Sequence, residues 1–232
     1  IQDWLERYPI IDSVLNQMGV NLDIKNKSVL DIGGSGKDLM YWLSEDSPRR
    51  IDHIEVSPTT QLFALEKVKA LENKSNKPLI HLLNFHTVPA EYLPFSNNCF
   101  DFIFSRGSLH HCFRPQVFDE IVRVLKPGGY ILFNERFLSD PLYKLMQLRR
   151  SLFNIDRGSD NPLRKVEIKY LEDKLTQSYW VNYNSGKVIE WIFGRKLNKV
   201  DDKPYDTLIF PSFINEKLNT FLAANVCFLG IK

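Results

Sequence analysis

The stretch Val29-Leu30-Asp31-Ile32-Gly33-Gly34-Ser35-Gly36 decides the fold. It begins as an apolar strand that contains one acid and ends as a tight, glycine-rich turn. A helix is expected to follow over Asp38–Leu43. Glycines in such a turn allow a ligand to approach the backbone closely, and the N-terminus of the following helix favours an anionic group. The stretch therefore predicts a strand–turn–helix unit with a ligand site at its turn.

A second strand, expected at Ile51–Val56, carries an acid near its end. Glu55 comes 24 residues after Asp31, and an acid at this place accepts hydrogen bonds from the ribose hydroxyls of a nucleoside cofactor. The alternative is an ordinary strand–helix turn followed by a surface acid. The turn and Glu55 together favour nucleoside binding.

Strands and helices alternate along the chain as far as about residue 136. The remaining strands of this part are expected at Leu79–Asn84, Cys99–Ser105 and Tyr130–Asn134, and its helices from Pro58 to about Leu71 and at Gln116–Leu125. Alternation of this kind predicts a parallel sheet, and the apolar strands predict that helices cover both faces. Farther along, helices are expected at Pro141–Phe153 and Val166–Ser178, and strands at Tyr179–Asn184 and Asn225–Ile231.

Composition and charge narrow the class of protein. The 232 residues are 44% hydrophobic and 25% charged, which fits one globular domain with an ample core. The net charge is only +2, and the nearest basic cluster, Lys144 with Arg149-Arg150, is short, so nucleic acid is not an expected partner. No apolar run approaches the roughly 20 residues of a membrane helix.

The cysteines indicate a reducing compartment. Cys99, Cys112 and Cys227 are odd in number and widely spaced, which favours free thiols over a disulfide framework. We therefore expect a cytoplasmic protein. Because residue 1 is Ile, we also expect the natural chain to begin earlier.

Four further motifs follow the opening stretch along the chain. They are Glu55-Val56-Ser57-Pro58, Ala90–Phe95, Phe100–Ser105 with His110-His111, and Val124–Gly129. In order and spacing these motifs resemble class I S-adenosylmethionine-dependent methyltransferases of type 11, over roughly residues 26–136. The resemblance implies a Rossmann-like, doubly wound α/β sheet of about seven strands, mostly parallel. Its antiparallel last strand would be Asn225–Ile231.

The resemblance also implies a set of cofactor-binding residues, grouped by strand. Asp31 and the turn Gly33–Gly36 would hold the methionine end of S-adenosylmethionine. Glu55 would bind the ribose, and Val56 would lie against the adenine. Ala90 and Glu91 would lie beside the adenine edge, and Ser105 and Arg106 would flank the methionine and the sulfonium. In chain order the residues are Asp31, Gly33, Gly34, Ser35, Gly36, Glu55, Val56, Ala90, Glu91, Ser105 and Arg106.

Two adjacent histidines are the candidate catalytic residues. His110 or His111 could act as a general base if the acceptor is a hydroxyl or an acidic carbon. The alternative is that both only pack at the start of a helix. Together with Cys112 they could suggest metal ligands, but adjacent side chains diverge and no partner pair is evident, so no metal is expected.

We expect one methyltransferase domain over residues 1–232. Residues 1–26 would form a helical cap over the cofactor, 27–136 the cofactor-binding core, and 137–232 the acceptor-side helices and the last two strands. The predicted activity is methyl transfer from S-adenosylmethionine to a small-molecule or lipid-like acceptor. The sequence defines no oligomeric state.

Two other classes of protein are possible interpretations of these residues, a nicotinamide dehydrogenase and a non-catalytic protein with the methyltransferase fold. A nicotinamide dehydrogenase would carry Gly-x-Gly-x-x-Gly, which the turn lacks. Ser35 and Lys37 stand where the methyltransferase family commonly has its second and third turn glycines, and Pro89 stands where it often has an acid. These departures leave open a non-catalytic binding protein with the same fold.

Overall fold

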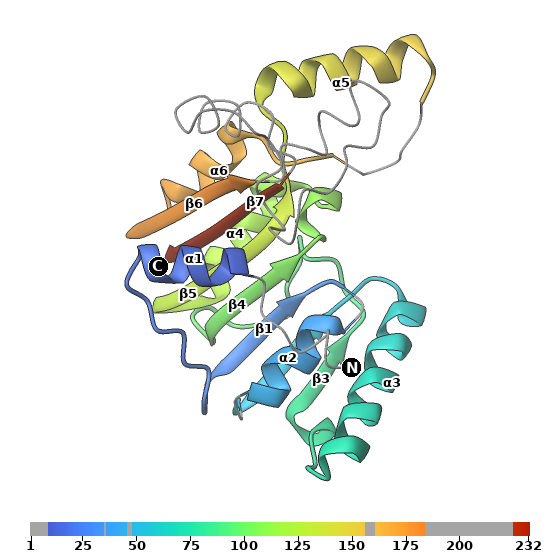
Figure 1. Ribbon diagram of the computed structural model, residues 1–232, viewed down its shortest axis with the longest axis vertical. Helices are drawn as coiled ribbons and strands as arrows, with labels where there is room; N and C mark the ends of the chain where they lie inside the picture. The colour runs from blue at the N-terminus through green and yellow to red at the C-terminus, as the bar shows by residue number, and fades with distance from the viewer. Residues whose placement is uncertain (1–8, 35, 46–47, 156–160, 184–224) are drawn as a thin grey trace, which may run out of the picture.

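The computed structural model describes residues 9–34, 36–45, 48–155, 161–183 and 225–232. Within them, seven strands form one sheet in the order β3-β2-β1-β4-β5-β7-β6 (Figure 1). The strands are β1 (Ser28–Ile32), β2 (Arg50–Ile54), β3 (Leu83–His86), β4 (Phe100–Arg106), β5 (Leu125–Arg136), β6 (Gln177–Tyr183) and β7 (Asn225–Ile231). The helices are α1 (Pro9–Gln17), α2 (Lys37–Glu45), α3 (Pro58–Ser75), α4 (Arg114–Val124), α5 (Asp140–Leu152) and α6 (Lys165–Glu172), with short 3-10 helices η2 (Ile80–Leu82) and η3 (Leu109–His111).

The first five strands run parallel to one another, as the alternating pattern predicts. The strand β7 lies between β5 and β6 and is antiparallel to both. This arrangement confirms the expected Rossmann-like sheet. It also confirms the interpretation of Asn225–Ile231 as the inserted antiparallel strand.

Helices cover both faces of the sheet and enclose two apolar cores. On one face, buried side chains of α1, α2 and α3 form one core with the sheet, and Trp42 of α2 packs edge-on against Phe102 and Phe104. On the other face, α4 and α6 bury their apolar sides. Both faces of the sheet are dry, and ligands are therefore confined to its ends.

The helix α1 belongs to one of these layers. It packs against β6 and β7, with Ile11, Val14 and Leu15 buried. The predicted cap of residues 1–26 over the cofactor stays a prediction, and residues 1–8 of it lie outside the described residues.

Local contacts move two predicted boundaries. The strand predicted at Leu79–Asn84 begins only at Leu83, because the Glu72 carboxylate accepts hydrogen bonds from the backbone N–H groups of Leu79 (2.6 Å) and Ile80 (2.9 Å) and fixes a 3-10 turn there. These bonds hold the pKa of Glu72 below its usual value. The helix predicted at Val166–Ser178 ends at Glu172, and β6 begins at Gln177.

The fifth strand is longer than predicted. The predicted strand was Tyr130–Asn134, whereas β5 begins at Leu125 and continues through Pro127-Gly128-Gly129 to Arg136. The irregular pairing with β4 between Phe100 and Phe102 accommodates this segment.

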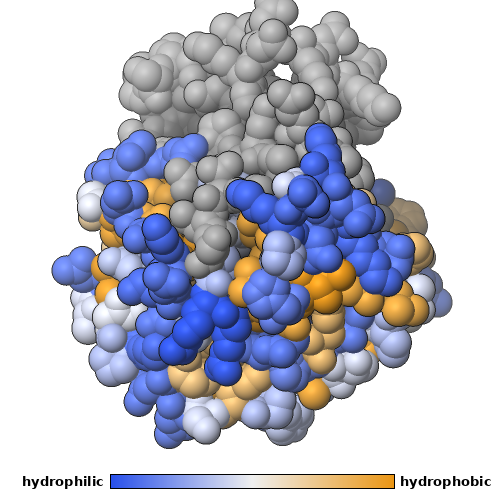
Figure 2. Space-filling model, turned by 90° about the horizontal axis from the view of Figure 1, so that it is seen from below, coloured by the Kyte–Doolittle hydropathy of each residue, from blue (hydrophilic) through white to orange (hydrophobic). Residues whose placement is uncertain are grey.

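Figure 2 shows one face of the molecule, seen from below. Among the described residues on this face, hydrophilic side chains predominate, with smaller hydrophobic areas between them. Among the described residues, no helix is both long and apolar enough to cross a membrane.

Candidate functional site

The candidate site lies at the edge of the sheet where the parallel strands β1, β2 and β4 end. Ile32 of β1 pairs with Ile54 of β2 and with Ser105 of β4, so the three strands end side by side. The segments that follow them therefore converge. In open α/β sheets this edge is where ligands bind.

The glycine turn is packed against both neighbouring segments. A Cβ on Gly33 would lie 2.6 Å from Cβ of Ser108, which follows β4, and 3.9 Å from Oε2 of Glu55, which follows β2. The φ of Gly33 is +71°, a conformation that L side chains rarely adopt. The structure thus brings Gly33 and Glu55 together as the sequence predicts, and it adds Ser108.

In the rest of the turn, some positions require glycine and others do not. Gly36 has φ +79°, and a Cβ there would lie 2.6 Å from Cα of Ala64 in α3. Lys37 instead begins α2 with a helical backbone, so the place of the missing third glycine needs none. Gly34 has φ +90°, and no described residue comes within 4 Å of a Cβ built there, which leaves space for a ligand at its backbone. Ser35 lies outside the described residues.

Glu55 is half-buried and held in place. Its Oε1 accepts a hydrogen bond from the backbone N–H of Ser57 at 3.0 Å, and its own N–H donates to the carbonyl of His86 at 3.1 Å. Val56 beside it is 63% exposed, an unusual setting for valine that leaves an apolar surface open next to the acid.

The pair Ala90-Glu91 comes to the same edge. Ala90 is buried, and the Glu91 carboxylate accepts a hydrogen bond from the backbone N–H of Phe113 at 2.7 Å. This bond ties the loop before β4 to the segment after η3.

Other predicted cofactor residues have partners inside the protein. Asp31 is 3% exposed, and its Oδ2 lies 2.7 Å from Nδ1 of His53. Ser105 is 2% exposed, with its Oγ 3.2 Å from the Ile32 carbonyl. Arg106 forms an ion pair with Asp38 at the start of α2, at 2.9 Å. Contact of these residues with a cofactor stays a prediction.

Glu135, at the end of β5, is the centre of a buried polar network. Its side chain is fully buried. One oxygen, Oε1, accepts hydrogen bonds from the backbone N–H groups of Ser108 (2.8 Å) and Leu109 (3.0 Å) and lies 3.1 Å from Oγ of Ser105. The other, Oε2, lies 2.9 Å from Nδ1 of His110. Burial of a carboxylate is costly, and these donors offset the cost.

The two candidate catalytic histidines differ sharply. The side chain of His110 is nearly buried and faces Glu135, whereas His111 is exposed. Their rings lie 4.0 Å apart. Glu135 lies 25 residues after His110, and no sequence motif links the two. Only the parallel pairing of β4 with β5 brings the two together.

Negative charge gathers at this edge. The pKa of the Cys112 thiol is raised to about 12, first by burial and then by the charges of Glu91, Glu135 and Glu55. Such a field attracts a cationic ligand and discourages an anionic one. Among the described residues, no cluster of three or more His, Cys, Asp or Glu side chains could hold a metal ion.

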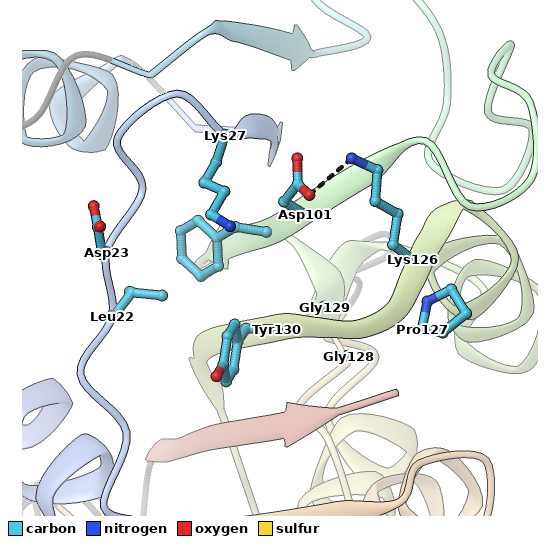
Figure 3. A pocket seen from close by; sticks show the side chains of 10 residues that line it. Leu22, Asp23, Lys27, Asp101, Lys126, Pro127, Gly128, Gly129 and Tyr130 are labelled. Atoms are coloured by element: carbon cyan, nitrogen blue, oxygen red, sulfur yellow. Dashed lines mark hydrogen bonds and ion pairs between the residues drawn. The ribbon is translucent and has the colours of Figure 1, made fainter.

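A second hollow lies at the opposite edge of the sheet. This cavity of about 200 Å³ is lined by the segment before β1 and the first residues of β4 and β5 (Figure 3). Lys126 pairs with Asp101 across it at 2.7 Å. Burial alone would raise the pKa of Asp101, but hydrogen bonds from Lys126 and from the N–H of Ser28 lower it overall. The cavity is remote from the glycine turn, so we do not assign the cofactor to it.

Known proteins resemble this chain in sequence and in fold. A family model described as a methyltransferase domain matches residues 30–133. A fatty-acid O-methyltransferase of Mycolicibacterium smegmatis is 27% identical over 178 residues, which are 71% of this chain and 61% of the relative. An uncharacterized protein of Methanocaldococcus jannaschii is 26% identical over 165 residues, 66% of this chain and 61% of the relative. The chain thus spans about three fifths of the length of these relatives.

A solved structure supports the same fold. The geranyl diphosphate C-methyltransferase of Streptomyces coelicolor, in complex with Mg²⁺, geranyl diphosphate and S-adenosyl-L-homocysteine, superimposes with a TM-score of 0.64 at 13% identity. The match covers 95% of this chain and 78% of that one.

Proposed function

Because residues 30–133 of this chain belong to the class I S-adenosylmethionine-dependent methyltransferase family, we propose that the protein transfers the methyl group of S-adenosylmethionine to a small-molecule or lipid-like acceptor. The observation that carries the proposal is the meeting of the glycine turn, Glu55 and the buried Glu135–His110 pair at one edge of the sheet.

The residues at this edge fit the cofactor. Gly34 leaves backbone open to the methionine end, Glu55 has a carboxylate for the ribose hydroxyls, and Val56 exposes an apolar side chain for the adenine. The surrounding acids favour a cation. When bound, S-adenosylmethionine supplies an electrophilic methyl group on a positively charged sulfur.

His110 is the better of the two candidate bases. If Nδ1 of His110 carries the proton and donates it to Glu135, the lone pair of the neutral imidazole is on Nε2, the atom that would take a proton from an acceptor hydroxyl. Glu135 also stabilises the imidazolium that results. A base of this kind favours an acceptor that must lose a proton when it is methylated.

The acceptor is proposed to be small or lipid-like rather than nucleic acid. A net charge of +2 offers little general attraction for phosphate backbones. One of the relatives is named as a fatty-acid O-methyltransferase, and a fatty acid is a lipid-like acceptor. We assign the acceptor side to residues 137–232 and place the protein in the cytoplasm, which its three free thiols support.

Calorimetric titration with S-adenosylmethionine and S-adenosylhomocysteine, with NADH as the control, tests the cofactor. One-to-one binding of the sulfur nucleosides without an NADH signal is expected. Release of S-adenosylhomocysteine is then measured with a fatty acid, the matching fatty alcohol and a phenol. Cofactor binding without turnover on any hydroxyl acceptor would favour a non-catalytic relative, and absence of binding would refute the cofactor assignment.

A further inference from the structure

The helix α5 carries an exposed row of leucines. Leu145, Leu148 and Leu152 are 48%, 56% and 69% exposed, and their spacing places them on one face of the helix. Phe153, directly after the helix, is 70% exposed. Of the thirteen helical residues only Leu142 is buried, and Figure 1 shows α5 at the upper end of the molecule, away from the sheet. Within the part of the chain that the structure describes, this apolar row faces solvent.

Basic side chains border the row. Lys144 and Arg149 lie on either side of the leucines on the helical surface, and Arg150 follows. The only acid on the helix is Asp140, in its first turn. An apolar row between cations suits an in-plane helix at an anionic lipid surface.

We propose that α5 docks this protein on an anionic lipid surface, with Leu145, Leu148 and Leu152 inserted among the acyl chains and Lys144 and Arg149 at the headgroups. The apolar row distinguishes this partner from a nucleic acid, which would need the charges but not the leucines. The proposal deepens the proposed function and rests on it for one point, that the acceptor is lipid-like and is taken from that surface.

The helix is linked directly to the candidate base. Arg150 of α5 donates to the side-chain oxygen of Asn161 at 3.3 Å, and the backbone N–H of Asn161 donates to the carbonyl of His110 at 2.9 Å. Arg114 donates to the carbonyl of Asn161 at 3.0 Å and braces the same connection. These hydrogen bonds connect α5, through Asn161, to the backbone of the candidate base.

Co-sedimentation with vesicles tests the surface without requiring turnover. The probes are phosphatidylcholine vesicles with and without about 30% phosphatidylglycerol. The wild-type protein is expected to bind the anionic vesicles, and Leu145→Ser, Leu148→Ser and Leu152→Ser combined should weaken binding about tenfold or more. Lys144→Gln with Arg149→Gln should also weaken it, by about fivefold per charge, and should remove most of its salt dependence.

The matched control removes exposed apolar area from another helix. Leu62 and Phe63 of α3 are 61% and 62% exposed, so Leu62→Ser with Phe63→Ser should leave vesicle binding unchanged. Absence of wild-type binding, or an equal loss in the control, would overturn the proposal. So would a wild-type dimer that the leucine variant dissociates, or capture of a single-stranded RNA that only the charge variant loses.

Cofactor titration of the same variants separates this proposal from the proposed function. The α5 variants should bind S-adenosylmethionine as the wild type does. Vesicle binding by a protein that binds no S-adenosylmethionine would refute the methyltransferase function and leave the surface standing.

Discussion

The carboxylate of Glu135 joins segments that are distant in sequence. It holds the backbone of Ser108 and Leu109 and the ring of His110 at once. If it orients the base, Glu135→Gln should lower kcat by about a hundredfold, since general base catalysis is typically worth at least that much. The KM for S-adenosylmethionine should change little, because the pair does not bind the cofactor. Steady-state kinetics with a hydroxyl acceptor measures both constants.

The two histidines provide a second test at the same scale. His110→Asn should lower kcat to the level of Glu135→Gln, whereas His111→Asn, on the exposed neighbour, should change it less than about threefold. Combining Glu135→Gln with His110→Asn should cost little more than either alone, because the two residues act as one unit. Equal losses at both histidines would contradict the choice of His110.

Glu55 is expected to contribute to binding and not to chemistry. Glu55→Gln should weaken S-adenosylmethionine binding about tenfold, because hydrogen bonds from the ribose hydroxyls to a charged acceptor are stronger than those to an amide. Glu66→Gln is the control, since Glu66 lies on the exposed side of α3 and pairs only with Lys69 among the described residues. Titration calorimetry that finds the same affinity for Glu55→Gln and wild type would sink the ribose assignment.

At the scale of elements, the glycine turn sets how closely α3 approaches β1. Gly36→Ala should destabilise the protein by about 3 kcal/mol, because its Cβ would meet the backbone of Ala64 and its φ is positive. Gly34→Ala shares the positive φ but meets nothing, so it should cost only about 1 kcal/mol. Urea unfolding measures the difference. Cofactor titration should show that Gly34→Ala nevertheless binds S-adenosylmethionine less tightly.

The elements that follow from local pattern are predictable from sequence. The β1 turn, the capped start of α3 and β7 all agree with their predictions, because apolar runs, a Ser-Pro helix start and glycine punctuation act locally. The late start of β3 depends on Glu72, seven residues before Leu79, and the length of β5 depends on its pairing with β4 and β7. Contacts of this range leave no periodic signal.

The candidate site also contains residues that a local motif predicts and residues that only long-range contacts bring together. Gly33 and Glu55 stand in motifs and meet as predicted. No motif marks Ser108 or Glu135 in the sequence. The parallel sheet places Ser108 beside the turn and Glu135 beside His110. Asp31 and Ser105 carry the right chemistry in the right motif, yet each has a partner within the fold.

For the whole molecule, stability should fall in acid. Hydrogen bonds from Arg123 hold the pKa of Glu120 below its ordinary value of 4.5, and those from Lys174 do the same for Asp119. A carboxyl group with a lowered pKa in the folded state stabilises the protein fully above its unfolded pKa and loses this effect as the pH falls. The urea midpoint should therefore decline from about pH 5 towards pH 3.

Glu120→Gln provides the control for this acid effect. The Glu120 carboxylate accepts from Arg123 and from the N–H of Leu93, and so ties α4 to the loop before β4. The variant should be less stable than wild type at pH 7 and should lose less on acidification. An identical pH dependence in both proteins would exclude Glu120 as a contributor.

The position of β7 inside the sheet has a consequence for the nascent chain. Of the seven strands it is synthesised last, yet it fills a slot between β5 and β6 inside the sheet. While the ribosome is still translating the segment before Asn225, β5 has an open edge and β6 lacks the strand with which it pairs. An open edge of apolar strand invites pairing with another chain. Protection of this growing polypeptide by a chaperone should therefore matter most in the seconds before β7 emerges.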